Sequence, residues 1–394
     1  MPSLAILRPR LRRWRFQRKL KADLVKRLSA ALAGPYQEGF NALLAELRRI
    51  QPLADGNKGV WSLPNGAAFY QNRIKNHTTL DLTADEIHRI GLDDVARIHI
   101  EMRAIQEVVG VEGSLQDFFA FIRTDPNNFY EDSDEGRAQF LADAQKQIDD
   151  IYEVVGDYFN TIPKADLEVR RVEPWRENST SIAFYNSPSE DLTRPGIYYA
   201  NLKDMKSVQK YVFGAITYHE SAPGHHFQLA LSREQEDLPS FRRYGGNNAF
   251  VEGWALYAEF LAKEMGFYTE PLYDFGRLQD EIWRSVRLVV DTGIHSKKWT
   301  RQQSIDYFME NTPISEGDII TEVERYFVNP GQALGYKMGM LKILELRRKA
   351  EAELGDKFDI RAFHDVVIGQ GAMTLPILER EVNKYIARNS TDAG

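Results

Sequence analysis

The sequence predicts a mainly α-helical fold with a small β-sheet or hairpin just before its most informative helix. Apolar residues recur at helical spacing along most of the 394-residue chain. Residues 82–86 form a helix-start signal, and runs of β-branched and aromatic residues are confined to residues 167–202. Since no stretch rich in Pro, Gly and Ser divides the chain, we predict one helical domain over residues 29–394 behind a basic extension of residues 1–28.

The basic extension carries ten cationic side chains: Arg8, Arg10, Arg12, Arg13, Arg15, Arg18, Lys19, Lys21, Lys26 and Arg27. A secretory signal places an apolar core after its positive residues, whereas here only residues 4–7 are apolar and they precede the first Arg. We therefore expect a cytoplasmic chain. A solvated helix face or a non-native start is favoured over contact with anionic lipid or nucleic acid. No run of 18 apolar residues occurs, so no transmembrane segment is predicted.

Composition limits the chemistry further. The formal net charge of −7 argues against nucleic acid as a partner. The absence of cysteine excludes thiol nucleophiles, Fe–S clusters and cysteine zinc sites, so a metal must be held by His and carboxylates. The sequence has no phosphate-binding loop, dinucleotide fingerprint or nucleophile elbow.

Helical spacing is clearest at residues 43–50, 87–102 and 140–155. Thr83 and Glu86 have the spacing of a capping box that begins the second of these helices. Strands are predicted at three short runs, Glu168–Val172, Ser181–Tyr185 and Gly196–Ala200.

The helix after these strands directs His219 toward the core. Its apolar stripe, at i, i+3, i+4, i+7 and i+8, consists of Val208, Tyr211, Val212, Ala215 and Ile216. His219 takes position i+11 of the same stripe. Glu220, His225 and His226 follow closely, and because the chain has only eight His, this clustering indicates a metal site.

The segment from His219 reads H-E-S-A-P-G-H-H, which is H-E-x-x-H with a Pro-Gly insertion. In H-E-x-x-H, two His one helical turn apart bind zinc and the Glu takes a proton from the zinc-bound water. On an unbroken helix His219 and His225 would point about 120° apart, and His226 would lie about 10 Å along the axis. A shared zinc therefore requires a break at Pro223-Gly224. Deleting that pair makes His225 the fifth motif position, so we prefer it to His226; alternatively, the Pro-Gly pair merely ends the helix.

Glu252 is the predicted third ligand. It lies among Phe250, Val251 and Trp254, where an isolated charge costs much free energy unless it is paired or bound to a cation. A buried salt bridge is the alternative. Glu259 falls on the same face at i+7 and is a candidate to orient a ligating imidazole.

Arg287, Asp291 and His295 follow one another at i+4 steps on a later helix. This charged stripe can position substrate carboxylate or carbonyl groups, or it can be a buried ion-pair ladder.

Gln332 and Tyr336 lie one turn apart, directly after a helix break at Pro330-Gly331. A Tyr hydroxyl facing a metal can stabilise the oxyanion of a tetrahedral intermediate. A Tyr that fills the core is commoner, so both roles stay open.

Together these residues resemble the DUF885 family, a group of bacterial proteins similar to zincin metallopeptidases. The resemblance covers about residues 30–385 and rests on Gly59–Pro64, His77–Thr79, Glu86–Gly91, Arg194–Gly196, His219–Gln228, Glu252–Ala255, Asp291–His295, Pro330–Ala333 and Tyr336.

The resemblance implies a gluzincin-like fold with two His and one Glu on zinc and a Glu general base. It also implies an edge strand that pairs with extended substrate, here Ser181–Tyr185 or Gly196–Asn201, and it supports catalytic roles for His295 and Tyr336. Family members are often exported or lipid-anchored and longer at the N-terminus. This chain begins near the shared region without a signal sequence or a lipobox Cys.

We therefore expect a zinc-dependent hydrolase that cleaves peptide or related amide bonds through a Glu-activated, zinc-bound water. The expected residues are Glu220, Tyr336 and His295 in catalysis, Arg287 and Gln332 in substrate binding, and His219, Glu252 and one of His225 and His226 on a single Zn²⁺. The alternatives are an inactive peptide-binding protein of the same fold and a zinc hydrolase of non-peptide esters or amides.

Overall fold

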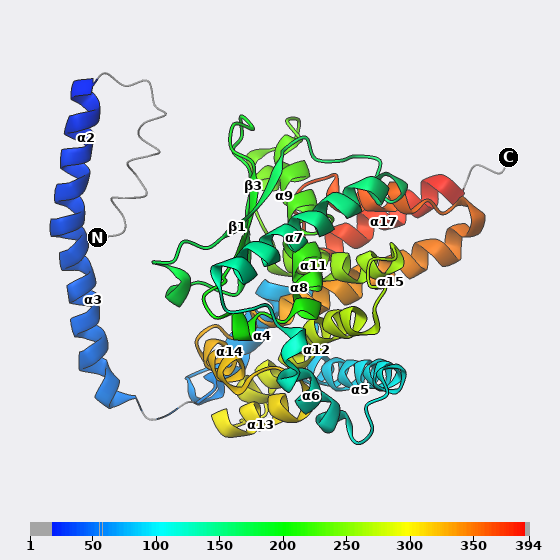
Figure 1. Cartoon of the computed structure of the whole chain (residues 1–394), viewed down its shortest axis with the longest axis horizontal. Helices are drawn as coiled ribbons and strands as arrows, with labels where there is room; N and C mark the ends of the chain where they lie inside the picture. The colour runs from blue at the N-terminus through cyan, green and yellow to red at the C-terminus, as the bar shows by residue number, and fades with distance from the viewer. Residues whose placement is uncertain (1–17, 55, 57, 391–394) are drawn as a thin grey trace. The chain divides into compact units, whose positions relative to one another are not determined.

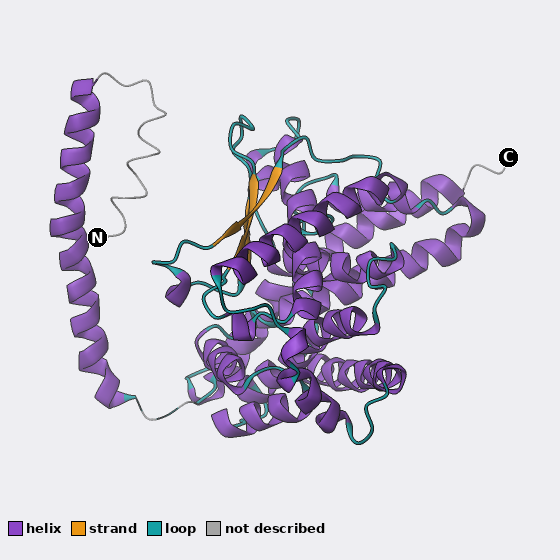
Figure 2. Ribbon diagram, viewed as in Figure 1, coloured by secondary structure: helices purple, strands orange, loops and turns teal. Residues whose placement is uncertain are grey.

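The computed structural model describes residues 18–54, 56 and 58–390. The chain divides into two compact units, Met1–Asn57 and Lys58–Gly394. Most of both units is helical, which confirms the predicted mainly α fold (Figure 2). None of the helices in the described ranges is long and apolar enough to cross a membrane.

The first unit contains helices α2 (Arg18–Ala31) and α3 (Gln37–Ile50), joined by the π-helical turn Leu32–Tyr36. Helix α2 runs through position 28, where the sequence pattern had placed a domain boundary. The compact units divide after Asn57, near the turn-forming residues Pro52 and Gly56. Residues 1–17 of the basic extension lie outside the described residues.

The second unit holds the remaining helices (Figure 1): α4 (Gly66–Thr78), α5 (Ala84–Val109), α6 (Leu115–Thr124), α7 (Asp134–Val154), α8 (Lys210–Glu220), α9 (His225–Glu234), α10 (Ser240–Arg243), α11 (Asn248–Glu264), α12 (Pro271–His295), α13 (Arg301–Asn311), α14 (Glu316–Val328), α15 (Leu334–Leu354), α16 (Ile360–Ile368) and α17 (Leu375–Ser390).

Local signals account for the helix boundaries. At the start of α5 the backbone N–H of Thr83 donates to the Glu86 carboxylate at 2.8 Å, and the backbone N–H of Glu86 donates to the Thr83 hydroxyl at 3.2 Å. This is the predicted capping box, in which each side chain satisfies a donor that the helix leaves free. The predicted interruption at Pro330-Gly331 separates α14 from α15.

The sheet has three strands, β1 (Leu167–Arg171), β2 (Ala183–Asn186) and β3 (Gly196–Ala200), in the order β1-β3-β2. β3 pairs in parallel with β1 and antiparallel with β2. Every residue of β3 is buried, so the strand predicted over residues 196–201 is central and cannot be the edge that receives substrate. β2 is an edge strand, because it pairs on one side only within the described sheet.

Two large apolar cores fill the second unit and meet at α8. Ile216 belongs to the core built mainly on α5, α6, α12, α13 and α14, whereas Tyr218 belongs to the core built on α9, α11 and α15–α17. In Figure 1, α8, α11 and α12 lie in the middle of this unit, with the sheet at one end and α5 and α13 at the other. The carboxyl end of α8, which carries His219, therefore lies between the two cores.

Candidate metal centre

The Pro-Gly pair breaks the helix as predicted. α8 ends at Glu220 and α9 begins at His225, with the turn Ser221–Gly224 between them. A Cβ on Gly224 would lie 2.1 Å from the carbonyl oxygen of His219, so only glycine fits there. The indole N–H of Trp254, on α11, lies 2.9 Å from the carbonyl oxygen of Pro223 and 3.2 Å from that of Gly224. The turn is thus fixed by the helix that carries Glu252.

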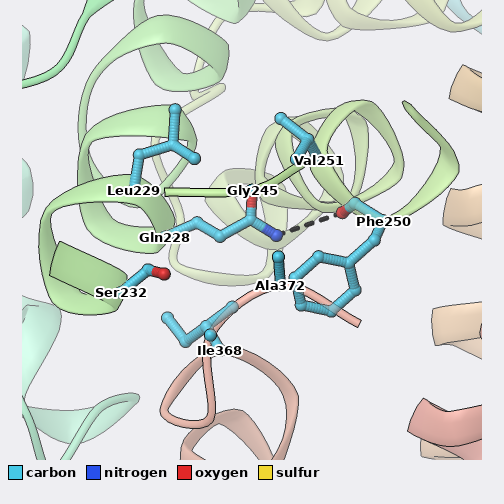
Figure 3. A pocket seen from close by; sticks show the side chains of 9 residues that line it. Gln228, Leu229, Ser232, Gly245, Phe250, Val251, Ile368 and Ala372 are labelled. Atoms are coloured by element: carbon cyan, nitrogen blue, oxygen red, sulfur yellow. Dashed lines mark hydrogen bonds between the residues drawn. The ribbon is translucent and has the colours of Figure 1, made fainter. Parts of the chain in front are cut away.

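Two further contacts hold α11 in place. The amide N–H of Gln228 on α9 donates to the carbonyl oxygen of Phe250 at 3.0 Å, beside a small pocket (Figure 3). On its other side α11 crosses α15 so closely that a Cβ on Gly253 would lie 2.4 Å from the Cα of Gly339. Since Glu252 lies between Phe250 and Gly253, these contacts fix its position.

His219, His225 and Glu252 converge on one point. Oε2 of Glu252 lies 3.7 Å from Nε2 of His219 and 3.6 Å from Nε2 of His225. Ligands about 2.0–2.1 Å from a tetrahedral zinc ion lie roughly 3.3 Å apart, so these three donors need only a small contraction to share one ion. The two imidazoles are buried, whereas the Glu252 side chain is 22% exposed, so the site opens to solvent at Glu252.

His226 points away from this cluster. Its Nδ1 lies 2.9 Å from the Tyr185 hydroxyl on β2, and its ring packs edge-on to that Tyr ring. A Cβ on Gly196 would lie 2.7 Å from the same Nδ1. Burial lowers the pKa of His226 to about 4, so this imidazole is neutral and supports the sheet.

Glu259 orients His219. Its Oε1 lies 2.7 Å from Nδ1 of His219, so the N–H at that position donates to the carboxyl and Nε2 is the ring nitrogen that faces Glu252. A carboxylate behind a ligating His is the common outer partner in zinc sites.

Glu220 lies beside the ligands with a free oxygen. One donor atom from each of His219, Glu220 and His225 lies within 4.8 Å of the others. Oε2 of Glu220 is buried and has no hydrogen-bond partner among the described residues. Burial raises the pKa of Glu220, while the imidazoles of His225 and His219 act to lower it.

The electrostatics of the cluster favour a cation. Burial disfavours a charged His219, but hydrogen bonds to Glu252 and Glu259 outweigh it and raise the pKa of His219 to about 10. Burial also opposes ionisation of Glu252, yet hydrogen bonds from His219 and His225 hold its pKa far below the usual range. The cluster thus stabilises a positive charge, which here is the charge of protonated His219. Two imidazoles and one carboxylate are ligand types that zinc accepts, so the residues present fit a Zn²⁺ ion.

A second set of donors is less suited to a metal. His219, Glu259 and Asp280 also lie within 4.8 Å of one another. Asp280 is already paired with the Arg284 guanidinium, which supplies a positive charge there. Burial and the charge of Asp280 raise the pKa of Glu259 to about 8, which favours a proton shared between the two carboxyls.

Tyr336 and Arg287 lie next to the cluster. Burial and the charge of Glu252 raise the pKa of Tyr336 to about 12, so the hydroxyl keeps its proton and can donate it. The Arg287 guanidinium lies 4.7 Å from the centre of the Tyr336 ring. Gln332 donates to the side-chain oxygen of Asn248 at 3.2 Å and accepts from Arg325, so it links α11 to the start of α15.

His295 and Asp291 are not brought to the cluster. Nε2 of His295 lies 2.9 Å from the carbonyl oxygen of Tyr326, and the Val60 backbone N–H donates to its Nδ1 at 3.2 Å. The carboxylate of Asp291 accepts from the Tyr70 hydroxyl at 2.6 Å and the Gly331 backbone N–H at 3.0 Å. Both side chains therefore hold chain segments together, and the oxyanion role expected for His295 has no free ring nitrogen to support it.

Sequence reasoning did not single out Asp280, Arg284 and Trp283. They lie on α12 within the two turns before Arg287. Asp280 pairs with Arg284 and lies near Glu259, and the Arg284 guanidinium lies 5.8 Å from the centre of the Tyr336 ring. The available signal was the i+4 spacing of Asp280 and Arg284, which is also common on solvated helix surfaces.

Comparison with known proteins shows the family of the chain. A sequence profile of DUF885, described as bacterial protein of unknown function, matches residues 6–382. A solved structure from Colwellia psychrerythraea, described as a “putative lipoprotein”, is 39% identical with a TM-score of 0.92, over 98% of this chain and 67% of that one. A second solved structure, from Shewanella oneidensis, is described as a “putative lipoprotein of unknown function”. It is 20% identical with a TM-score of 0.72, and the match covers 95% of this chain and 69% of that one, so it shows likeness of fold alone. No curated protein is significantly similar.

Proposed function

The chain belongs to the DUF885 family of bacterial proteins of unknown function, and on that footing we propose that it is a zinc-dependent hydrolase of peptide or related amide bonds with a zincin-like site. One observation carries the proposal. Glu220 holds a buried carboxylate oxygen, unpartnered within the described chain, beside three donors that converge at zinc-site spacing. A carboxylate in that position has the geometry of a general base.

His219, His225 and Glu252 would hold the ion. A bound zinc ion supplies a Lewis acid that polarises the scissile carbonyl and makes water acidic enough to react at neutral pH. Glu259 contributes by holding His219 in the tautomer whose Nε2 is free. His226 has no part in this site.

Glu220 accepts the proton of the attacking water. Its Oε2 has no hydrogen-bond partner among the described residues and is therefore available for that proton, and its burial keeps bulk water from competing for it. The protonated Glu220 can then pass that proton to the leaving amine.

The hydroxyl of Tyr336 is the proposed donor to the oxyanion. It stays protonated at neutral pH and lies close enough to Glu252 for that charge to raise its pKa. His295 is not proposed for this role, because its two ring nitrogens contact the backbone of Tyr326 and Val60.

We also propose that the protein works outside the cytoplasm. The Colwellia relative, 39% identical, is described as a “putative lipoprotein”, and lipoproteins are exported. The cytoplasmic location expected from the basic extension receives no support from this relative.

The proposal is tested by incubating the zinc-loaded chain with a library of unmodified peptides, with and without a chelator. We expect cleavage that stops on chelation and returns when zinc is restored. Cleavage of ester or non-peptide amide probes alone would replace the peptide substrate, and cleavage that ignores the chelator would overturn the zinc mechanism.

A further inference from the structure

Three N–H donors on α12 are buried and lack an acceptor in the part of the chain that the structure describes. They are Nη1 of Arg287, Nε of Arg284 and Nε1 of Trp283. A buried donor without an acceptor is unfavourable, and such groups are rare in folded proteins unless a bound molecule satisfies them. Three within five residues of one helix indicate a ligand site.

The three donors form one cluster. The guanidinium carbons of Arg284 and Arg287 each lie 5.2 Å from the centre of the Trp283 ring. They lie 5.8 and 4.7 Å from the centre of the Tyr336 ring. Stacking on aromatic rings uses the faces of a guanidinium, whereas its N–H bonds lie in its plane, so the rings do not replace the missing acceptors.

Neighbouring residues hold both arginines in place. Nε of Arg287 donates to the Tyr326 hydroxyl at 3.1 Å, and Nη2 donates to Glu322 at 2.9 Å. Nη1 of Arg284 donates to Asp280. Each guanidinium is thus anchored by its own chain and keeps one buried nitrogen whose N–H has no acceptor among the described residues, which is a prepared arrangement for an anion.

The charge balance also favours an anion. Glu322 is the acidic partner of both Arg287 and Arg325, each at 2.9 Å. One carboxylate therefore faces two guanidinium groups at Arg287 and Arg325, so this pair carries one positive charge more than Glu322 balances, whereas the charge of Arg284 is balanced by Asp280. An incoming carboxylate would neutralise it and accept from two N–H groups at once.

The cluster borders the metal centre and the surface. Tyr336, whose ring stacks with Arg287, is the residue whose hydroxyl is influenced by Glu252. Arg284 and Arg287 are buried, but Trp283 and Tyr336 are half-buried. The two guanidinium groups therefore lie against rings that are partly exposed, one of which belongs to the proposed catalytic residue Tyr336.

We propose that Arg287, Arg284 and Trp283 bind a free carboxylate of the substrate, so that the enzyme removes residues from the carboxyl end of peptides or acylated amino acids. This inference rests on the proposed function for its catalytic part. The carboxylate site itself is defined by the three donors and does not depend on zinc.

The test compares two substrates that differ only in this group, an acylated peptide with a free carboxyl terminus and the same peptide as its amide. With the zinc-loaded wild-type protein we expect kcat/KM at least 10-fold higher for the acid, mostly through KM. Arg287→Lys keeps a positive charge beside Glu322 but loses the several N–H groups of the guanidinium, so it should remove the preference for the acid over the amide. Trp283→Phe keeps the ring and loses one donor, so a smaller effect is expected, and Arg301→Gln, in an exposed pair with Glu324, is the control.

Calorimetric binding of the same two peptides gives a readout without turnover. The acid should bind the inactive Glu220→Gln protein more tightly than the amide, and Arg287→Lys should abolish the difference. Hydrolysis with equal kcat/KM for acid and amide would overturn the carboxylate site and leave the proposed hydrolase intact. Arg287-dependent binding of the acid by a protein that neither holds zinc nor cleaves peptides would support the site and overturn the hydrolase.

Discussion

The two adjacent imidazoles His225 and His226 show how strongly the surroundings of a single residue decide its role. Nε2 of His225 lies 3.6 Å from Glu252, while His226 contacts Tyr185 on the sheet. One side chain faces a cluster of ionisable groups, and the other is neutral and packed under a strand.

This difference predicts opposite results for two alanine variants. His225→Ala should lose most of its bound zinc, because two protein ligands rarely suffice for a zinc site. His226→Ala should retain zinc and lose stability instead, since it removes a buried ring and its hydrogen bond. Zinc content per folded chain and the midpoint of thermal unfolding check both statements; zinc loss in the His226 variant alone would reverse the assignment.

Glu220 is predicted to be needed for turnover and not for metal binding. Glu220→Gln preserves the shape of the side chain but cannot accept a proton, so hydrolysis should fall about 10²–10⁴-fold, the usual contribution of a general base. Zinc content should stay unchanged. Activity within a few-fold of wild type at full zinc content would remove Glu220 from the mechanism.

Among the elements, the break between α8 and α9 matters most to the site. It allows His219 and His225, six positions apart in sequence, to bring their Nε2 atoms to the same carboxylate oxygen. The backbone of Gly224 and the indole of Trp254 maintain this break from two sides.

Gly224→Ala should therefore damage the site. The added Cβ would meet the carbonyl oxygens of His219 and Tyr218 at 2.1 and 2.3 Å, so the backbone must move. This displacement should cost about 1–3 kcal/mol of stability and weaken zinc binding. Gly317→Ala is the matched control. Gly317 lies in helix α14, and a Cβ added there would meet nothing within 4 Å among the described residues. Equal zinc affinity in the two variants would show that the break tolerates a side chain.

The helix α16 carries another buried imidazole, His364, whose protonation should affect stability. Nδ1 of His364 donates to the carbonyl oxygen of Tyr158 and Nε2 accepts from the Tyr257 hydroxyl, each at 2.8 Å. This arrangement requires a neutral ring. Burial, with the charge of Arg347, lowers the pKa of His364 to about 3.

Between pH about 6.5 and about 3, the unfolded chain binds a proton at position 364 that the folded chain does not. The free energy of unfolding should therefore fall with falling pH in this window, by up to about 1.4 kcal/mol per pH unit from this group. His364→Gln should remove this one-proton contribution from the dependence of the unfolding free energy on pH. Urea unfolding followed from pH 3.5 to 6.5 measures it, and identical slopes would show that His364 is protonated in the folded chain.

In the molecule as a whole, the sequence predicted what depends on local pattern. The helical period, the capping box at Thr83 and the break at Pro223-Gly224 all depend on neighbouring residues, and all are present. The convergence of Glu252 with the two His was inferred from the cost of burying a lone carboxylate.

The predictions that depended on distant contacts were weaker. The order of the three strands places β3 in the centre, which the sequence of each strand does not encode. His295 shares a helix with Arg287, yet its partners include Val60, 235 positions away. Periodicity shows which face of a helix is buried, but not which distant segment covers it.

The most direct test is the zinc content of the purified chain beside that of His219→Ala, each loaded with zinc, desalted and checked for folding by circular dichroism. A metal centre built on His219, His225 and Glu252 predicts close to one zinc per wild-type chain and almost none in the variant, with helix content unchanged. Equal zinc in both proteins, or none in either, would contradict the metal centre and with it the proposed hydrolase.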